Sequence, residues 1–241
     1  MNNQTIFLLK NLPNLLLGFP GHRPGGLLMS ILLAMVAIGV GFLLAVIIGT
    51  GYKSRFRPLR LLAYAYVQLF RGIPLILLLL IVHQLLGFGR QLGLERTALT
   101  SALVTLTLYS SAYQAEIVRA GLQSVPQPMV ESARLMGSSQ RQTYWLIKIR
   151  YTLHVMLPAF TGQAISLFKD TSVVIILGVA ELMTVARIAL GSEVGNAPYW
   201  VSMFLVVGFF YFSVAFSLSR IAQRWEHGHR SGDLVHSLAN Y

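Results

Sequence analysis

The chain has 241 residues, of which 55% are hydrophobic and only 11% are charged, against about 25% charged in ordinary soluble domains. Its mean hydropathy of +0.63 indicates an integral membrane protein, and the basic residues behind its net charge of +11 lie between apolar runs. This pattern argues against nucleic acid as a partner, and the absence of cysteine excludes disulfides and thiolate metal sites.

Residues 1–24 lack the features of a cleavable secretion signal. Lys10 and Pro13 interrupt the apolar run, and no basic segment precedes it. The apolar positions favour a short amphipathic helix lying at the membrane interface, with a poorly ordered terminus as the alternative. We therefore treat residues 1–24 as an N-terminal interfacial segment.

The rest of the chain carries five stretches that are free of Asp, Glu, Lys and Arg. They are residues 24–52, 72–89, 97–115, 151–168 and 194–219. A membrane-crossing helix needs about 20 mostly apolar residues, within a range of about 17–25. The ten uncharged residues 171–180 are too few to cross, and they either continue or break the fourth span. The fold class expected is an all-α membrane protein with about five transmembrane helices in residues 25–225 and a cytoplasmic tail at residues 226–241.

The distribution of basic residues predicts the orientation of these five spans. One side would hold twelve of them: Lys53, Arg55, Arg57, Arg60, Arg119, Arg134, Arg141, Lys148, Arg150, Arg220, Arg224 and Arg230. The other side would hold five: Lys10, Arg23, Arg90, Arg96 and Arg187. Because loops rich in Lys and Arg stay in the cytoplasm, the first side is expected to be cytoplasmic and the N-terminus outside.

Residues 116–150, called the polar island below, interrupt the oily sequence and are predicted to face the cytosol. Pro128 suits the first turn of a helix running from Met129 to Met136, and Gly137 can end it in the left-handed conformation. Val130, Ala133 and Gly137 would then share a face of small residues. Such a helix can dock closely on another protein, or it can lie on lipid headgroups. The residues alone leave both interpretations open.

A family resemblance favours docking. Glu131, Ser132 and Ala133, then Gly137, then Ile147 resemble the EAA–G–I signature of ABC importer permeases. Four stretches resemble the polar amino-acid subfamily in order and approximate spacing: residues 66–75 (YVQLFRGIPL), 112–126 (AYQAEIVRAGLQSVP), 166–173 (SLFKDTSV) and 177–182 (LGVAEL). The resemblance covers roughly residues 60–225 and implies the architecture of a type I ABC importer permease.

The sequence departs from the family pattern at three positions. Ser132 replaces the middle Ala of the signature, which is a small change. Arg150 stands where the family usually has proline, so the helix entering the fourth span is expected to run straighter. Gly162 occupies a position that is often Asn in relatives, which changes the lining of the pathway.

The resemblance also implies a mechanism and a set of partners. Two permease subunits, identical or related, would pair in the bacterial inner membrane and work by alternating access on a cytosolic ATPase dimer. A coupling loop at about residues 120–150 would dock on an ATPase through Glu131, Ser132, Ala133 and Gly137. An extracytoplasmic solute-binding protein would deliver a polar amino acid, with acidic amino acids among the candidates. The residues themselves support one part of this mechanism, because the chain has no G-x-x-x-x-G-K-[S/T] phosphate loop. ATP and magnesium would therefore be bound by the partner ATPase. The chain itself would be neither an enzyme nor a cofactor carrier.

Ionisable residues at membrane depth are the candidates for a translocation path or gate. Arg71 precedes a helix break at Gly72 and Pro74, where it would bind lipid phosphate or an interhelical carbonyl, or attract a substrate carboxylate. Lys169 and Asp170 would point about 100° apart on a helix, so they would not simply pair. Their roles are either separate pairing in a subunit interface or, as the family resemblance favours, a gate.

Further polar residues complete this picture. Thr171 and Ser172 would add hydrogen bonds to the gate. Glu181 is expected at the membrane interface or the outer vestibule. His83 and His154 suit interhelical hydrogen bonds better than a proton relay, and neither has metal-ligand spacing.

Two other function classes remain as alternatives. An ion-coupled secondary transporter would usually have more spans and an internal repeat. An intramembrane enzyme would need a catalytic motif, and the spans contain no G-x-S-x-G, H-E-x-x-H or paired aspartates.

Overall fold

The computed structural model describes residues 3–20, 24–52, 54–88 and 97–238, with side chains described up to Arg224 at the C-terminal end. Some of the basic residues that were counted for the topology therefore lie outside the described residues or side chains: Arg23, Lys53, Arg90, Arg96 and Arg230.

The described chain is helical almost throughout, which confirms the all-α part of the expected fold class. In chain order the α-helices are α1 (Asn3–Leu17), α2 (Gly26–Gly51), α3 (Arg57–Gly72), α4 (Leu75–Phe88), α5 (Ala98–Ser124), α6 (Gln127–Leu135), α7 (Gln140–Gln142), α8 (Arg150–Val155), α9 (Leu157–Asp170), α10 (Leu182–Gly191) and α11 (Trp200–Leu238). Between them lie the π-helix η2 (Thr143–Ile149) and the 3-10 helices η3 (Thr171–Leu177) and η4 (Val194–Tyr199). Helix α11 continues beyond Arg224 through residues of the expected cytoplasmic tail.

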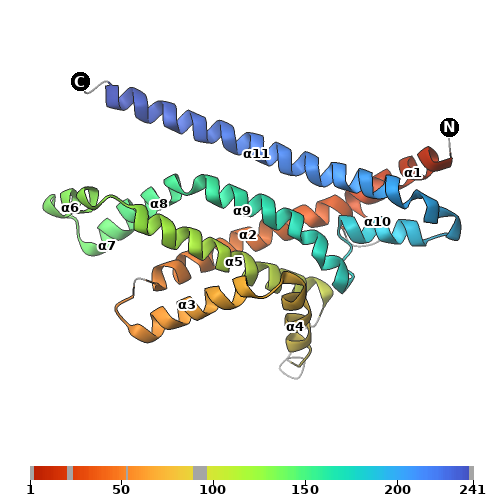
Figure 1. Ribbon diagram of the computed structural model, residues 1–241, viewed down its shortest axis with the longest axis horizontal. Helices are drawn as coiled ribbons and strands as arrows, with labels where there is room; N and C mark the ends of the chain where they lie inside the picture. Colours follow the sequence, from red (N-terminus) through yellow and green to blue (C-terminus); the bar gives the residue numbers. More distant parts are fainter. Residues whose placement is uncertain (1–2, 21–23, 53, 89–96, 239–241) are drawn as a thin grey trace.

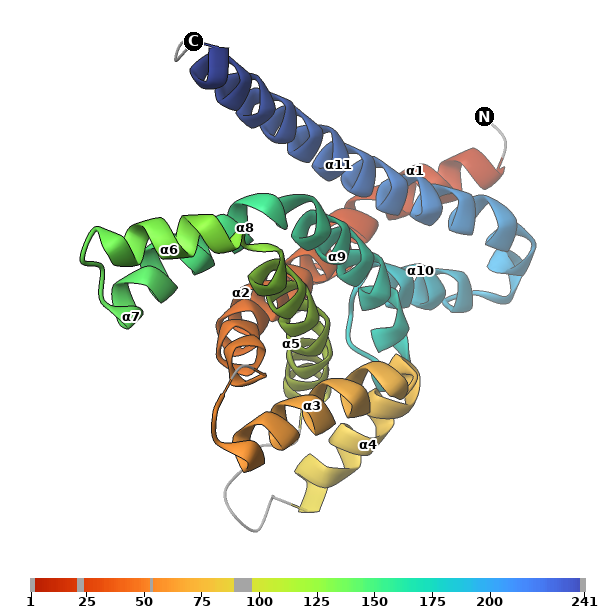
Figure 2. The same ribbon diagram turned by 60° about the vertical axis from the view of Figure 1, so that its left-hand side comes forward.

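The long helices lie roughly along one axis of the molecule. Following the chain in Figure 1, α2, α5 and α11 run in one direction, and α3 and α9 run in the other. Helices α6 and α7 lie at one end of this axis, whereas α1 and the turn between α10 and α11 lie at the opposite end. Figure 1 shows α4 at a steep angle to these helices, and Figure 2 shows how it turns back sharply from the end of α3.

Helices α2 and α5 form the central pair of the bundle. They pack closely because α2 has glycine where it meets α5: a Cβ on Gly49 would lie 2.7 Å from the Val118 side chain. The amide nitrogen of Gln114 on α5 donates hydrogen bonds to the Ile38 carbonyl on α2, at 3.3 Å, and to the Ser110 hydroxyl, at 2.7 Å. Small residues and interhelical hydrogen bonds of this kind hold helices together in lipid, where apolar burial provides little drive.

Three helical segments are long and apolar enough to span a membrane: Gly26–Gly51, Leu157–Leu177 and Val194–Arg224. A fourth results if Arg57–Gly72 and Leu75–Gly87, which meet at a bend of 113°, count as one broken span. The chain thus has three to four candidate spans by length and composition within the described residues, where the sequence analysis expected about five. The missing one is α5, which has 27 residues but carries buried polar side chains such as Ser101, Thr105 and Gln114.

The second expected span, residues 72–89, is displaced in the structure. Helix α3 ends at Gly72, and Ile73 is extended with φ −98° and ψ 133° because the following Pro74 disfavours a helical residue before it. The predicted break at Gly72 and Pro74 is therefore confirmed, and it separates α3 from α4, which begins at Leu75. Of the two possibilities left open for residues 171–180, the structure shows continuation, because η3 extends α9 as far as Gly178, which has a left-handed φ of 72°.

Candidate functional site

Beyond the end of α5 at Ser124, the polar island folds into short helices at one end of the molecule. Helix α6 spans Gln127–Leu135, close to the predicted range Met129 to Met136, and the predicted turn residues lie at its two ends. Pro128 lies in the first turn of α6. Gly137 follows the helix with φ 87°, its N–H bonds the Arg134 carbonyl at 3.0 Å, and the Ser138 N–H bonds the Ala133 carbonyl at 3.0 Å. These two bonds form a Schellman motif, which satisfies the last carbonyls of a helix. The end of α6 is therefore set by local backbone geometry.

The face that α6 exposes differs from the one expected. Val130 and Ala133 are buried, with the helix packed on η2 of the same chain, so these small residues are not available to a partner. A Cβ on Gly137 would meet nothing within 4 Å, so Gly137 is required for its left-handed φ and not for close packing. Instead, Leu135 and Met136 are exposed by 89% and 87%.

The signature residues divide between these two faces. Glu131 and Ser132 are exposed, and the Gln127 amide donates a hydrogen bond to the Glu131 carboxylate at 3.1 Å. Ala133 faces the protein, and Gly137 sets the turn. The structure therefore places a polar pair and two large apolar side chains on one exposed tip.

The chain continues from the island into the fourth span without a break at Arg150. The π-helix η2 passes directly into α8, and the helix is interrupted only at Met156, before Pro158 in the first turn of α9. This agrees with the expectation that replacing the family's proline by Arg150 lets the helix run on. Trp145 and Leu146 on η2 are exposed.

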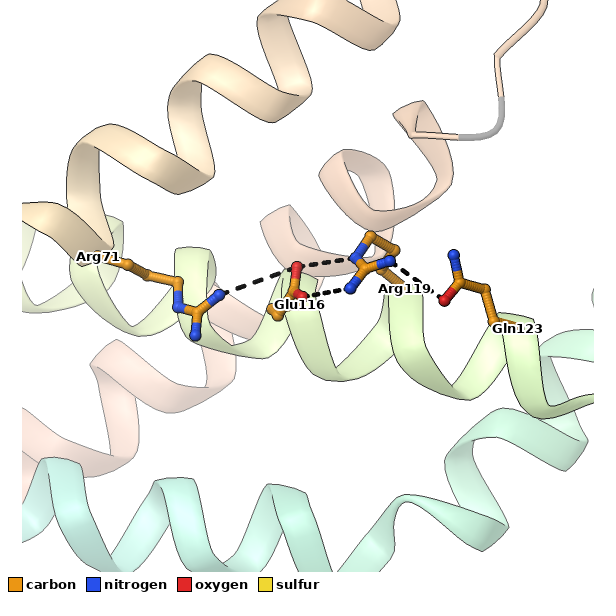
Figure 3. Close-up of polar contacts among 4 residues, drawn as sticks. All are labelled: Arg71, Glu116, Arg119 and Gln123. Carbon is orange, nitrogen blue, oxygen red and sulfur yellow. Dashed lines mark hydrogen bonds and ion pairs between the residues drawn. The ribbon is translucent and has the colours of Figure 1, made fainter.

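Arg71 belongs to a charged ladder along α5 (Figure 3). Its guanidinium lies 3.9 Å from the Glu116 carboxylate, which also accepts a hydrogen bond from Arg119 Nε at 2.9 Å. Arg119 in turn donates to the Gln123 side-chain oxygen at 3.1 Å. The partner of Arg71 is thus a carboxylate of the protein itself. The sequence analysis had expected a lipid phosphate, an interhelical carbonyl or a substrate carboxylate.

Aromatic rings flank both guanidinium groups of this ladder. Arg71 lies 5.1 Å from the ring centroid of Tyr113, and Arg119 lies 5.6 Å from that of Tyr52. Both distances are within the range of cation–π attraction. One carboxylate shared by two guanidinium groups leaves a net positive charge, and the long Arg71–Glu116 contact is the weaker of the two. Arg71 is therefore the member of the ladder that another anion could most easily engage.

Lys169 and Asp170 lie at the junction of α9 and η3, inside a candidate span. Lys169 is exposed and Asp170 is half-buried. No ion pair joins the two among the described residues, which agrees with the prediction that their side chains point about 100° apart on the helix. The hydroxyl of Thr171 donates to the Phe168 carbonyl at 2.7 Å, and that of Ser172 to the Lys169 carbonyl at 2.8 Å. Both hydroxyls thus bond the last turn of α9, and Thr171 is fully buried.

The described contacts do not join these candidates into one site. No hydrogen bond or ion pair in the described part of the chain links Arg71 to Lys169 or Asp170. His83 bonds the Ser101 hydroxyl across two helices at 2.8 Å, as an interhelical role predicts. Within the described residues, no group of three His, Asp or Glu side chains is arranged to hold a metal ion.

Glu181 is the residue that the sequence analysis misplaced. It was expected at the membrane interface or the outer vestibule, but its side chain is completely buried where α2, α10 and α11 meet. Its carboxylate accepts hydrogen bonds from the backbone N–H groups of Met183 and Thr184, at 2.8 and 2.7 Å. It also accepts from the hydroxyls of Thr184, at 2.8 Å, and of Tyr211, at 3.0 Å.

Burial raises the pKa of the Glu181 carboxyl above its ordinary value, although the hydrogen bonds that it accepts oppose this shift. The signal in the sequence was its isolation: it is the first charged residue after ten uncharged ones. Glu181 also occupies the N-cap position of α10, which the sequence analysis did not predict.

Comparison with known proteins places this geometry among membrane transport components. Residues 37–228 match the family described as "Binding-protein-dependent transport system inner membrane component". The probable glutamine ABC transporter permease protein of Bacillus subtilis (strain 168) is 32% identical over 201 residues, covering 83% of this chain and 90% of that protein. A glutamate/aspartate import permease protein of Escherichia coli O6:H1 is 33% identical over 199 residues, covering 80% of this chain and 87% of that protein.

A solved structure shares the fold over nearly the whole chain. It is described as an amino acid ABC transporter with histidines, and it matches with a TM-score of 0.78 and 26% identity. The match covers 94% of this chain and 99% of that one.

Proposed function

The chain belongs to the family of binding-protein-dependent transport system inner membrane components, and we propose that it is the permease subunit of an ATP-driven importer of polar amino acids. It is an inner-membrane transport subunit and not itself an ATPase. The observation that carries the proposal is the exposed tip of α6, which presents Leu135 and Met136 at one end of a helical membrane bundle.

Helix α6 acts in this proposal as the coupling helix. Large apolar side chains that stay exposed outside the membrane mark a surface for a partner. Leu135 and Met136 would enter a cleft on the ATPase, and Glu131 and Ser132 would bond its rim. Ala133 would act from within, by packing α6 on η2, and Gly137 by setting the turn. Closure of the ATPase dimer on ATP and magnesium would then be transmitted through η2 and α8 into α9.

Five crossings suit this role better than three or four. We take α5 as the additional crossing, since 27 residues span about 40 Å and its buried polar groups face protein instead of lipid. The alternating directions of α2, α3, α5, α9 and α11 support this arrangement. It leaves the N-terminus outside and the polar island in the cytosol, as the positive-inside rule also favours.

The translocation path is proposed to include Arg71, Lys169 and Asp170. Charged groups at membrane depth are costly and usually face a cavity or another subunit. Arg71 is loosely held by Glu116, and Lys169 is exposed in the isolated subunit. Thr171 and Ser172 would support the gate by holding the end of α9. A second permease subunit, identical or related, would cover this side of the chain.

The substrate class follows from the relatives, which are named for glutamine and for glutamate and aspartate. We propose a polar amino acid with an acidic or amide side chain, delivered by an extracytoplasmic solute-binding protein.

Uptake by the reconstituted complex tests the function. The permease would be reconstituted with a phosphate-loop ATPase and a binding protein encoded beside it, and radiolabelled amino acids would be supplied with ATP inside the vesicles. ATP-dependent uptake of glutamine, glutamate or aspartate is expected. Uptake that needs an ion gradient and not ATP would contradict the proposal.

Cysteine labelling tests the orientation separately, because the chain has no native cysteine. Ser138→Cys should react with an impermeant thiol reagent in inverted membranes and stay unlabelled in intact cells. Labelling of intact cells from outside would overturn the cytosolic placement of α6.

A further inference from the structure

A groove at the junction of α2 and α3 has no part in the proposed path or in the coupling helix. Its volume is about 590 Å³, and its lining residues are Tyr52, Arg57, Pro58, Arg60, Leu61 and Tyr64. Figure 1 places this junction at the same end of the molecule as α6 and α7. The groove therefore lies at the end that the proposed orientation assigns to the cytosol.

The charged side chains that line the groove are all cations. Arg57 and Arg60 are both exposed, and neither forms an ion pair among the described residues. A third guanidinium, that of Arg119, lies over the ring of Tyr52 and has already engaged Glu116. The groove thus presents uncompensated positive charge, and its ligand should be an anion.

The walls of the groove and the surface beside it are apolar. Tyr52 and Tyr64 meet edge to face with ring centroids 6.4 Å apart. Next to the arginines, Leu61 and Leu62 are each exposed by 67%. A free phosphate would use the cations and leave this apolar surface in water, whereas a phospholipid has an anionic head and acyl chains that match both parts.

We propose that this groove binds the headgroup of an anionic phospholipid of the cytosolic leaflet. Its phosphate would lie against Arg57 and Arg60, and its acyl chains would follow the exposed leucines of α3. Basic pockets between membrane helices on the cytoplasmic side are known to take acidic lipid headgroups. The inference uses the proposed orientation, but it does not depend on what the protein transports.

The purified full chain tests this inference by native mass spectrometry. It would be mixed with phosphatidylglycerol or with phosphatidylcholine of the same acyl chains, and the retained lipid counted. We expect phosphatidylglycerol to be retained preferentially. Arg57→Gln with Arg60→Gln should weaken its binding by about fivefold for each arginine removed, the factor expected for one basic residue near an anionic surface.

A matched variant separates the groove from general charge attraction. Arg141→Gln with Arg150→Gln also removes two exposed arginines from the same end of the molecule, but neither lines the groove. This variant should retain phosphatidylglycerol like the parent chain. Circular dichroism would establish that both variants are folded.

Several results would overturn the inference. Equal loss in both double variants would mean that only net charge matters, and equal retention of phosphatidylcholine would mean an unspecific apolar groove. A change in the monomer–dimer equilibrium of the groove variant, with lipid retention unaltered, would assign the groove to a second copy of the chain. ATP-driven uptake by the complex reconstituted with each variant, measured separately, keeps the outcomes apart, because intact uptake with no lipid preference rejects the lipid site alone.

Discussion

The two ends of the molecule hold their polar groups in different ways. At one end, α6 is terminated by its own backbone at Gly137, and Leu135 and Met136 remain exposed. At the other end, the Glu181 carboxylate is completely buried and is satisfied by α10 and by Tyr211 of α11. An exposed tip can be built from local turns, whereas a buried carboxyl group needs hydrogen-bond partners from several helices.

The largest expected effect is at the buried end. Glu181→Ala would leave the N–H groups of Met183 and Thr184 and the Tyr211 hydroxyl without their acceptor. We expect a loss of about 3 kcal/mol or more, since three buried groups lose their acceptor and each costs roughly 1–3 kcal/mol. Thermal unfolding of the purified full chain would measure it. The exposed Glu193 provides the control, because Glu193→Ala should leave the midpoint unchanged; equal midpoints for all three proteins would refute the role of Glu181.

The next effect concerns the turn after α6. Gly137→Leu places a branched side chain at φ 87°, which costs about 1–2 kcal/mol and should displace the tip of the helix. Uptake should fall several-fold while the protein remains membrane-inserted. Gly137→Asn is the matched control, because Asn tolerates the left-handed region and should retain most activity. Normal uptake by the Leu variant would show that coupling does not need this turn.

The buried end should also make the stability of the protein depend on pH. Burial raises the pKa of Glu181 in the folded state above its unfolded value of about 4.3. Its contribution to stability is therefore full below about pH 4.3 and is lost as the pH rises through the raised folded pKa. The unfolding midpoint of the parent chain should fall over this window more than that of Glu181→Gln. Parallel pH profiles would mean that Glu181 does not titrate differently on folding.

The smallest effect on stability is expected at the exposed tip. Leu135→Ser with Met136→Ser should leave the unfolding midpoint nearly unchanged, because both side chains are already in water. It should nevertheless weaken binding of the ATPase by about tenfold, which co-purification or a binding titration would measure. Leu146→Ser, which removes an apolar side chain exposed by 60% on η2, is the control. Unaltered ATPase binding by the double variant would move the docking surface away from α6.

Much of the candidate site followed from residue types and spacing. Pro128 and Gly137 predicted where α6 begins and ends, and Pro74 predicted the break after α3, because these residues restrict or release the backbone locally. The family assignment also came from short motifs and is confirmed. The roles of Glu131, Ser132 and the gate residues stay predictions.

Other features depended on contacts that no local pattern contains. The small face of α6 looked free in the sequence, but η2 covers Val130 and Ala133. Arg71 found its partner in Glu116, 45 positions along the chain, because α3 packs on α5. The hydropathy of α5 does not distinguish a helix that crosses inside a bundle from one that lies outside the membrane.

The sequence by itself thus determined the membrane class, the family and the turns that bound α6. These depend on composition and on backbone preferences, which act within a few residues. Only the tertiary structure decided which side of α6 is exposed, what pairs with Arg71, and that Glu181 is buried. Those outcomes follow from how helices distant in the chain pack, since a charged or polar group in a membrane protein takes its partner from whichever helix lies beside it.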